Sequence, residues 1–94
     1  MTIHTQHTHA DQKQEFLSNL HRMHTTVLGE ERIRRNLGLA AADVVGWCAE
    51  QSRLPGSCIV RRGKNWYICT GACEITVNAH SYTVITAHRL KADG

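Results

Sequence analysis

The sequence predicts an α+β fold in which two or three N-terminal helices pack on one face of a four-stranded antiparallel β-meander. Hydrophobic residues recur at helical spacing up to Pro55. Beyond Pro55 they recur at every second residue, as in a strand. A chain of 94 residues, 41% of them hydrophobic, can build one modest core. Residues 1–10 are polar, rich in histidine and aperiodic, so we expect a disordered tail there. Residues 11–94 are expected to form a single domain.

The helical half is expected to contain three helices. Asp11 suits an N-cap, and apolar residues at helical spacing then predict a first helix over roughly residues 12–23. Thr25-Thr26 offers two N-cap candidates for a second helix that ends at Gly38. A third helix is expected to begin near Asp43. The side chains expected to point inward from the second and third helices are Leu28, Ile33, Leu37, Val44, Val45, Trp47 and Cys48.

The second half is expected to contain four strands, at residues 58–62, 65–70, 73–78 and 81–88. Gly63-Lys64 fits a two-residue type II′ turn, because glycine stands at the first central position. Two-residue turns are also expected at Gly71-Ala72 and at Ala79-His80. The last of these turns would place Val77 opposite Tyr82.

This register gives the sheet one apolar and one polar face, as an antiparallel sheet covered on one side requires. The helices are expected to cover the apolar face, and His88 falls on that side by parity. The apolar face comprises Ile59, Trp66, Ile68, Ile75, Val77, Tyr82 and Val84. The polar face comprises Arg62, Tyr67, Glu74, Thr76, Asn78, Ser81, Thr83 and Arg89.

The polar face carries the residues that we expect to contact a ligand. On this register Tyr67, Thr76 and Thr83 form one row across three strands. Phosphodiester cleavage needs a base, an acid and cations that stabilise the developing charge. The expected catalytic residues are His80, Tyr67 and Thr83, and the expected anion-binding residues are Arg61, Arg62, Lys64, Asn78 and Arg89. The simpler alternative is a solvated face whose threonines favour strand structure.

The positive charge lies in the second half of the chain. Residues 1–56 contain six Lys/Arg and six Asp/Glu, whereas residues 57–94 contain five Lys/Arg and two Asp/Glu, so the net charge of +3 belongs to the β half. A basic surface of this kind indicates an anionic partner such as RNA. Ordinary solubilising charge is the alternative.

The cysteines and histidines raise the question of a metal site. His21 and His24 are three residues apart, and Cys58, Cys69 and Cys73 lie near one another on the predicted register. The chain lacks paired CxxC motifs at zinc-site spacing, so we expect no metal and no cofactor. The N-terminus has no secretory signal, and no apolar run is long enough to span a membrane. We therefore expect a cytoplasmic protein without a membrane partner, whose cysteines are thiols.

Three segments carry a resemblance to known proteins. They are residues 24–37, residues 62–67 and residues 75–88, which begin His24-Thr-Thr, Arg62-Gly-Lys and Ile75-Thr-Val. Together they resemble a family of small bacterial proteins of uncharacterised function, over about residues 17–91. The chain also resembles, at the level of fold, the barnase, colicin and RelE-like ribonuclease toxins. That second resemblance implies RNA cleavage on the exposed sheet face, although Glu74 is the one carboxylate in the predicted sheet.

The functional expectation is an RNA-binding or metal-independent RNA-cleaving protein that acts through the polar sheet face. The alternative is a non-enzymatic protein-interaction module, antitoxin-like or regulatory, that uses the same basic surface. An exposed sheet edge would also allow a homodimer.

Overall fold

The computed structural model describes residues 9–40 and 42–90. It confirms the predicted α+β class, with helices first and an antiparallel sheet after them. The expected tail lies outside these residues, except that His9 and Ala10 begin the first helix. The elements in chain order are α1 (His9–Leu17), the 3-10 helix η1 (Leu20–Arg22), α2 (Val27–Leu37), α3 (Val44–Arg53), β1 (Cys58–Arg62), β2 (Asn65–Cys69), β3 (Cys73–Asn78) and β4 (Val84–Arg89).

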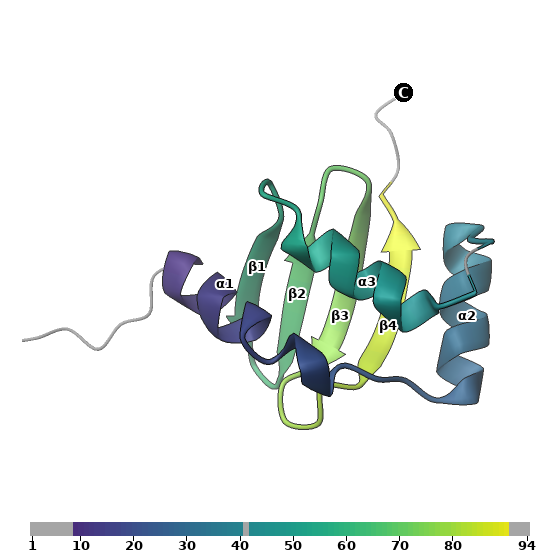
Figure 1. The fold of residues 1–94 in the computed structure, drawn as a ribbon, viewed down its shortest axis with the longest axis horizontal. Coiled ribbons are helices and arrows are strands. Elements are labelled where there is room, and N and C mark those ends of the chain that lie inside the picture. The colour runs from purple at the N-terminus through teal and green to yellow at the C-terminus, as the bar shows by residue number, and fades with distance from the viewer. Residues whose placement is uncertain (1–8, 41, 91–94) are drawn as a thin grey trace, which may run out of the picture.

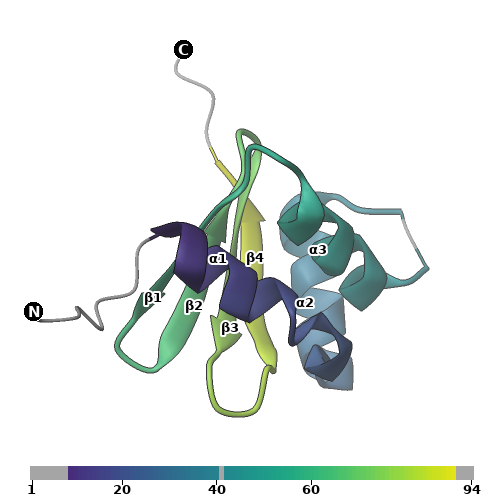
Figure 2. The same ribbon diagram turned by 60° about the vertical axis from the view of Figure 1, so that its left-hand side comes forward.

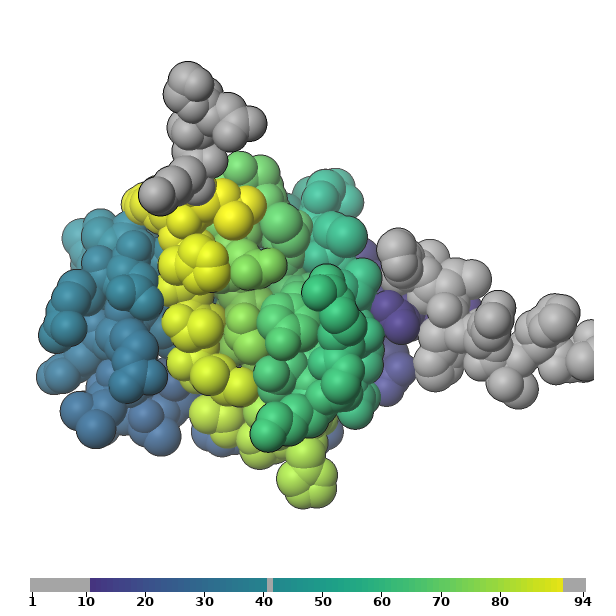
Figure 3. Space-filling view, turned by 180° about the vertical axis from the view of Figure 1, so that it is seen from behind, coloured from purple at the N-terminus to yellow at the C-terminus, as the bar shows by residue number. Residues whose placement is uncertain are grey.

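The sheet is a meander with the strand order β1-β2-β3-β4, as predicted. Helices α1 and α3 lie across one face of it, whereas α2 runs beside β4 (Figures 1 and 2). Figure 3 shows the opposite face, where the strands are open to view. Only the first face is covered, because only that face is apolar. None of the described helices has the length and apolarity that a membrane span requires.

The ends of α2 and α3 follow the sequence signals. The Thr26 hydroxyl accepts a hydrogen bond from the Gly29 amide, and the Asp43 carboxylate accepts one from the Gly46 amide. Gly38 ends α2 in the left-handed conformation with φ of 61°, which glycine adopts without steric cost. These boundaries were predictable because each cap is a contact between near neighbours in the chain.

The predicted first helix is wrong at both ends. α1 begins at His9, so Asp11 lies inside its first turn, and α1 ends at Leu17. The Ser18 hydroxyl and the Asn19 side-chain amide both donate to the Glu15 carbonyl. Side chains that compete for backbone carbonyls in this way weaken a helix. The chain continues as the short η1 turn and then extends.

The first two hairpins have the predicted register. Cys58 lies opposite Cys69, Val60 opposite Tyr67, and Ile68 opposite Ile75. Gly63 has φ of 58° while Lys64 stays out of the positive region, as a type II′ turn requires and a type I′ turn does not.

The third hairpin differs from the prediction. Val77 pairs with Val84 rather than with Tyr82, so the connection is a longer loop at residues 79–82. The pairing then shifts between Thr76 and Val77, which makes Ile85 an extra residue in β4.

This bulge inverts the faces of the residues that follow it. His88 was predicted on the covered side, yet it lies opposite Glu74 and is exposed. Arg89 was predicted on the polar face, yet it lies opposite the buried Cys73. One added residue shifts a two-residue period by half a cycle, so every later side chain changes side.

The core lies between the sheet and the helices. The Phe16 ring packs 5.4 Å from Trp66 and 5.5 Å from Tyr82, measured between ring centroids. Leu28 was predicted to point inward, but its side chain is 71% exposed. The buried stripe of α2 runs through Gly29, Ile33 and Leu37 at intervals of four residues, and Leu28 lies one position off it. The predicted apolar sheet face is buried throughout: Ile59, Trp66, Ile68, Ile75, Val77, Tyr82 and Val84.

We predict that Ile33→Ala lowers the free energy of unfolding by about 2–5 kcal/mol, because it empties a site with no exposed surface. Leu28→Ala, by contrast, changes it by less than about 0.5 kcal/mol. Urea unfolding followed by circular dichroism measures both. Equal losses in the two variants would show that Leu28 is buried.

We predict that Cys58 is alkylated by iodoacetamide in the native protein at pH 8, whereas Cys48 is protected until the protein unfolds. Burial raises the pKa of the Cys48 thiol to about 12, with the neighbouring Cys73 adding to the effect. Roughly one Cys48 thiol in ten thousand is then a thiolate at pH 8. Cys58 is exposed. Peptide mapping by mass spectrometry gives the order in which the two cysteines are alkylated. Rapid labelling of Cys48 in the native protein would contradict the packing of α3.

Candidate functional site

Three segments that are distant in the sequence meet at the end of the sheet where the β1–β2 turn and the β3–β4 loop lie. They are residues 20–24, 61–64 and 78–83, and we call them the hairpin end. The Ala79 amide donates to the Lys64 carbonyl at 2.8 Å, which ties the two connections together. Arg22 Nη2 donates to the His80 carbonyl at 2.6 Å, which ties η1 to the loop.

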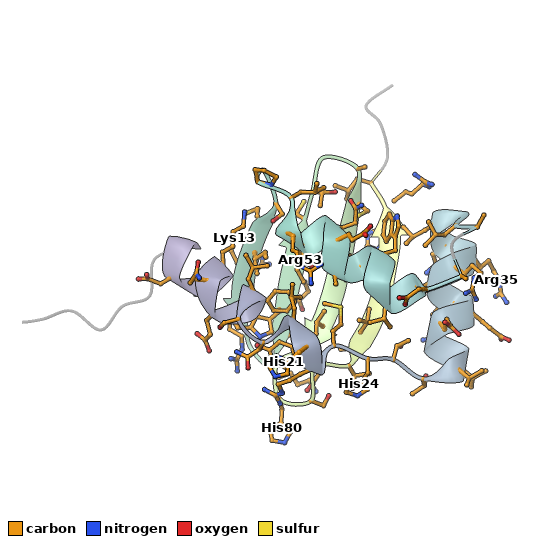
Figure 4. All side chains as sticks on the ribbon, in the orientation of Figure 1. Lys13, His21, His24, Arg35, Arg53 and His80 are labelled. Atoms are coloured by element: carbon orange, nitrogen blue, oxygen red, sulfur yellow. The ribbon has the colours of Figure 1, made fainter. Side chains whose placement is uncertain are left out.

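His24 joins the helical half of the chain to the sheet. Its amide donates to the Tyr82 carbonyl at 3.1 Å, and its carbonyl accepts from the Val84 amide at 2.7 Å. His24 and Thr83 thus form a parallel bridge outside β4. Figure 4 shows His21, His24 and His80 at this same end of the sheet. The bridge occupies part of the outer edge of the sheet and directs the His24 ring toward the loop.

Three arginines of the hairpin end lie over aromatic rings. The guanidinium carbon of Arg22 is 4.5 Å from the Tyr82 centroid, that of Arg62 is 5.2 Å from Tyr67, and that of Arg61 is 5.8 Å from Trp66. Each distance falls within the range of a cation–π contact. A stacked guanidinium keeps its N–H donors in its own plane, so these arginines are held in place and can still bind an anion.

Charged side chains from three elements act on the Tyr82 phenol. Burial raises the pKa of the Tyr82 phenol, and a contact with the Trp66 indole lowers it. The Glu15 carboxylate raises it further, and Arg22 and Arg61 lower it. The indole Nε1 is buried and makes no hydrogen bond of ordinary geometry among the described residues, so the contact with the phenol is a loose one.

Asn78 and Tyr82 set the shape of the β3–β4 loop. The Asn78 Oδ1 atom accepts from the amides of His80 at 3.0 Å and Ser81 at 2.9 Å. Tyr82 has φ of 60° and is the one non-glycine residue with positive φ in the described chain. Such a conformation is uncommon for a bulky residue and is retained where the surroundings enforce it. Here the buried ring, held between Phe16 and Arg22, enforces it.

A line of hydrogen bonds runs from His24 into the loop. His24 Nε2 lies 3.1 Å from Thr83 Oγ1, which lies 2.7 Å from Ser81 Oγ. Ser81 Oγ is 3.2 Å from Asn78 Oδ1. At the other side of the ring, His24 Nδ1 lies 2.9 Å from the Arg22 carbonyl. A carbonyl can only accept, so Nδ1 carries a proton, and in the neutral ring Nε2 is the acceptor for the Thr83 hydroxyl.

The predicted catalytic residues lie in three different places. Tyr67 is half-buried on the open face, opposite Thr76 as predicted, and its hydroxyl lies 3.4 Å from Asn65 Nδ2. Thr83 was predicted to continue that row, but Thr86 does so, because the loop is longer and β4 is bulged. His80 is exposed at the tip of the loop, and its ring points away from the sheet (Figure 4).

The predicted anion-binding residues are also divided. Arg62 lies on the open face and Lys64 in the adjoining turn, whereas Arg61 leans over Trp66 on the helix side. Arg89 does not lie with the other predicted anion-binding residues. Its Nε donates to the Leu37 carbonyl at 2.7 Å and so caps α2. The Asn78 side chain is engaged within its own loop rather than directed at a ligand.

Sequence reasoning missed Arg22 and the contact of His24 with the loop, whereas Ser81 was predicted as part of the polar face. The side chains of Arg22 and His24 join the hairpin end through contacts with residues such as His80, 58 positions from Arg22, and Thr83, 59 positions from His24. No local pattern reports such a contact. The pairing of η1 with the loop follows from where the helices rest on the sheet.

The opposite end of the open face carries a second polar row. Cys58, Cys69, Glu74 and His88 lie on successive strands, and His88 Nε2 is 3.7 Å from Glu74 Oε1. Desolvation raises the pKa of the Cys69 thiol, and the Glu74 carboxylate adds to the effect. Among residues 9–40 and 42–90, no three His, Cys, Asp or Glu side chains are arranged to hold a metal ion.

The comparison with protein families identifies a relationship. A family model described as "Protein of unknown function (DUF3781)" matches residues 17–88. The chain belongs to this family. The expected likeness to an uncharacterised family is thereby confirmed, and the DUF3781 match spans the whole hairpin end while most of α1 precedes it. No curated protein and no solved structure matches the chain significantly.

We predict that Asn78→Ala lowers the free energy of unfolding by about 1–3 kcal/mol, because two loop amides lose their acceptor. Hydrogen exchange of the His80 and Ser81 amides should accelerate more than that of the β1–β2 turn. The control is Asn36→Ala, at an exposed position of α2. Unchanged exchange in the loop of the Asn78 variant would mean that its shape does not depend on this side chain.

Proposed function

We propose that this protein binds single-stranded RNA through the hairpin end. The observation that carries the proposal is the gathering of four cationic side chains at this end from two segments of the chain: Arg22 from η1, and Arg61, Arg62 and Lys64 from β1 and the turn after it. The cation–π contacts hold the three arginines before any ligand arrives, so little side-chain entropy is lost on binding. Planar guanidinium groups bind phosphate, as they bind carboxylate, through two parallel hydrogen bonds.

The shape of the surface supports a chain-like ligand. No cavity for a small molecule is found in the described part of the molecule. The open sheet face is broad and uncovered, and the β3–β4 loop projects from its end (Figure 3). A flexible single strand can follow such a surface and place a base on an exposed aromatic ring. Tyr67 is the aromatic side chain at this end that is not fully buried.

The hydroxyl groups of the β3–β4 loop favour RNA over DNA. Ser81 and Thr83 lie in the same loop as His80 and next to His24. Ribose offers a 2′-hydroxyl that can both donate and accept, and a protein distinguishes RNA from DNA through such contacts. The site proposed here is therefore the hairpin end with the adjoining part of the polar face, rather than the whole face. The fold-level resemblance to ribonuclease toxins that we expected from the sequence finds no support among solved structures, so the proposal rests on the chemistry of the hairpin end.

A second candidate is a protein-interaction module of antitoxin-like or regulatory type. Val27 and Leu28 favour it, because these adjacent aliphatic side chains are 74% and 71% exposed at the start of α2. A homodimer formed by pairing of sheet edges is less favoured. The Arg61 amide at the β1 edge already donates to Gln12 Oε1, and His24 occupies part of the β4 edge.

We predict salt-dependent binding of a fluorescein-labelled single-stranded oligoribonucleotide of mixed sequence, followed by fluorescence anisotropy in EDTA. Arg62→Ala and Lys64→Ala should each weaken binding by about 3- to 10-fold, and each should reduce the slope of log K against log salt by about 0.7. The same sequence as DNA should bind more weakly.

The matched control is Arg35→Ala, which removes an equal charge from α2 at a distance from the hairpin end (Figure 4). If Arg35→Ala weakens binding as much as Lys64→Ala does, the attraction is a net-charge effect and the proposed site is wrong. If the wild-type protein does not bind RNA at all, the interaction-module candidate takes its place.

A further inference from the structure

The His24 ring is arranged as a base at pH values where it is neutral. The Arg22 carbonyl holds the proton on Nδ1, so the lone pair of Nε2 faces the Thr83 hydroxyl. A hydroxyl and an imidazole within hydrogen-bond reach, with the ring oriented by a third group, form the arrangement from which enzymes draw protons. Here the third group is a backbone carbonyl.

The hydrogen bonds that run from His24 through Thr83 and Ser81 to Asn78 can take up a proton without leaving a group unpaired. In the neutral state Thr83 donates to His24 Nε2, and Ser81 donates to Thr83 Oγ1. When Nε2 is protonated it donates to Thr83, which can then donate to Ser81, and Ser81 to Asn78 Oδ1. Every donor has an acceptor in both states. The line can therefore pass a proton from Thr83 to His24 Nε2 without breaking its hydrogen bonds.

The residue with strained backbone, Tyr82, lies in the same loop as these hydroxyl groups. Tyr82, with its positive φ, stands between Ser81 and Thr83, whose hydroxyl oxygens are 2.7 Å apart. A glycine would adopt this conformation freely, yet the chain has a tyrosine whose ring is locked in the core. Strained residues of this kind cluster at functional sites, where the rest of the fold compensates for them.

We propose that the protein cleaves the RNA that it binds, with Thr83 as the catalytic residue at the ribose and His24 as the base that acts through it. The inference rests on the proposed RNA binding. Thr83 Oγ1 accepts from Ser81 and donates to His24, which leaves one lone pair for an incoming 2′-hydroxyl. The cations of the hairpin end hold the adjacent phosphate.

The reaction is an intramolecular transesterification. The 2′-oxygen attacks the neighbouring phosphorus while its proton passes to Thr83, whose own proton passes to His24 Nε2. The bond from phosphorus to the 5′-oxygen breaks, and that oxygen takes a proton from water. The products are a 2′,3′-cyclic phosphate and a 5′-hydroxyl, and His24 then returns its proton to solvent. Arg22, whose guanidinium donates to the His80 carbonyl of the same loop, would stabilise charge on the phosphorane.

The test compares binding with cleavage in the same variants. The substrate is the mixed-sequence oligoribonucleotide in EDTA, and a form with 2′-O-methyl groups throughout, which cannot react, reports binding alone. His24→Ala and Thr83→Val should lose at least about 100-fold in cleavage rate while keeping binding within about threefold. Thr83→Ser should retain cleavage, because it restores the hydroxyl. The control is His88→Ala, which removes an exposed imidazole from the opposite end of the sheet.

The pH–rate profile separates proton transfer from a structural role. The wild-type rate should rise with pH as the imidazole loses its proton, and this limb should be absent from His24→Ala. If that variant does not fold, Thr83→Val against Thr83→Ser and the nitrogen-15 spectrum of the His24 ring still test the inference. A ring with its proton on Nε2 would overturn it, as would cleavage by Thr83→Val at the wild-type rate. RNA binding without cleavage by the wild type overturns this inference and leaves the proposed function standing, whereas failure to bind the methylated strand overturns both.

Discussion

The backbone bridge between His24 and residues 82–84 is the contact on which the rest of the structure depends. Two hydrogen bonds, of 3.1 and 2.7 Å, fasten the segment between η1 and α2 to the outer edge of the sheet. On one side of the bridge, α1 and η1 come to lie over the apolar face, where Phe16 packs on Trp66 and Tyr82. On the other side, α2 starts beside β4, and the Thr25 hydroxyl donates to the Val84 carbonyl. The helical half therefore cannot slide along the sheet without breaking both the core and the bridge.

The same bridge explains why polar groups gather at one end of the molecule. The loop after β3 is held open by the Asn78 side chain and by the buried ring of Tyr82, so its hydroxyls face the His24 ring instead of pairing with solvent alone. Arg22 meets the loop from η1, and the β1–β2 turn meets it from the other hairpin. Tyr82 and Trp66 have two roles. Their buried rings fill the interior, and a face of each ring receives an arginine side chain. Stability and the candidate site thus depend on the same residues.

The two ends of the open sheet face differ in chemistry. The hairpin end combines fixed cations with hydroxyls and an oriented imidazole, whereas the far end presents two thiols, a carboxylate and the His88 ring. Glu74 and His88 face each other there, so the carboxylate is engaged away from the cations and does not neutralise them. This separation makes the polar face asymmetric. The cations and hydroxyl groups are therefore concentrated at the hairpin end rather than spread over the whole face.

The sequence by itself determined the fold class, the order of the elements, the first two hairpin registers, both ends of α2 and the start of α3. Each of these follows from near neighbours: Thr26 and Asp43 cap amides three residues on, Gly38 and Gly63 accept positive φ, and the alternation of apolar residues selects the covered face. Only the tertiary structure decided the bulge at Ile85, the exposure of Leu28, the capping role of Arg89 and the partnership of His24 with Thr83. These depend on contacts between residues that are far apart in the chain or on the phase of a strand after an inserted residue. A single sequence carries no local signal for either, because the free energy that selects them comes from packing the two halves together.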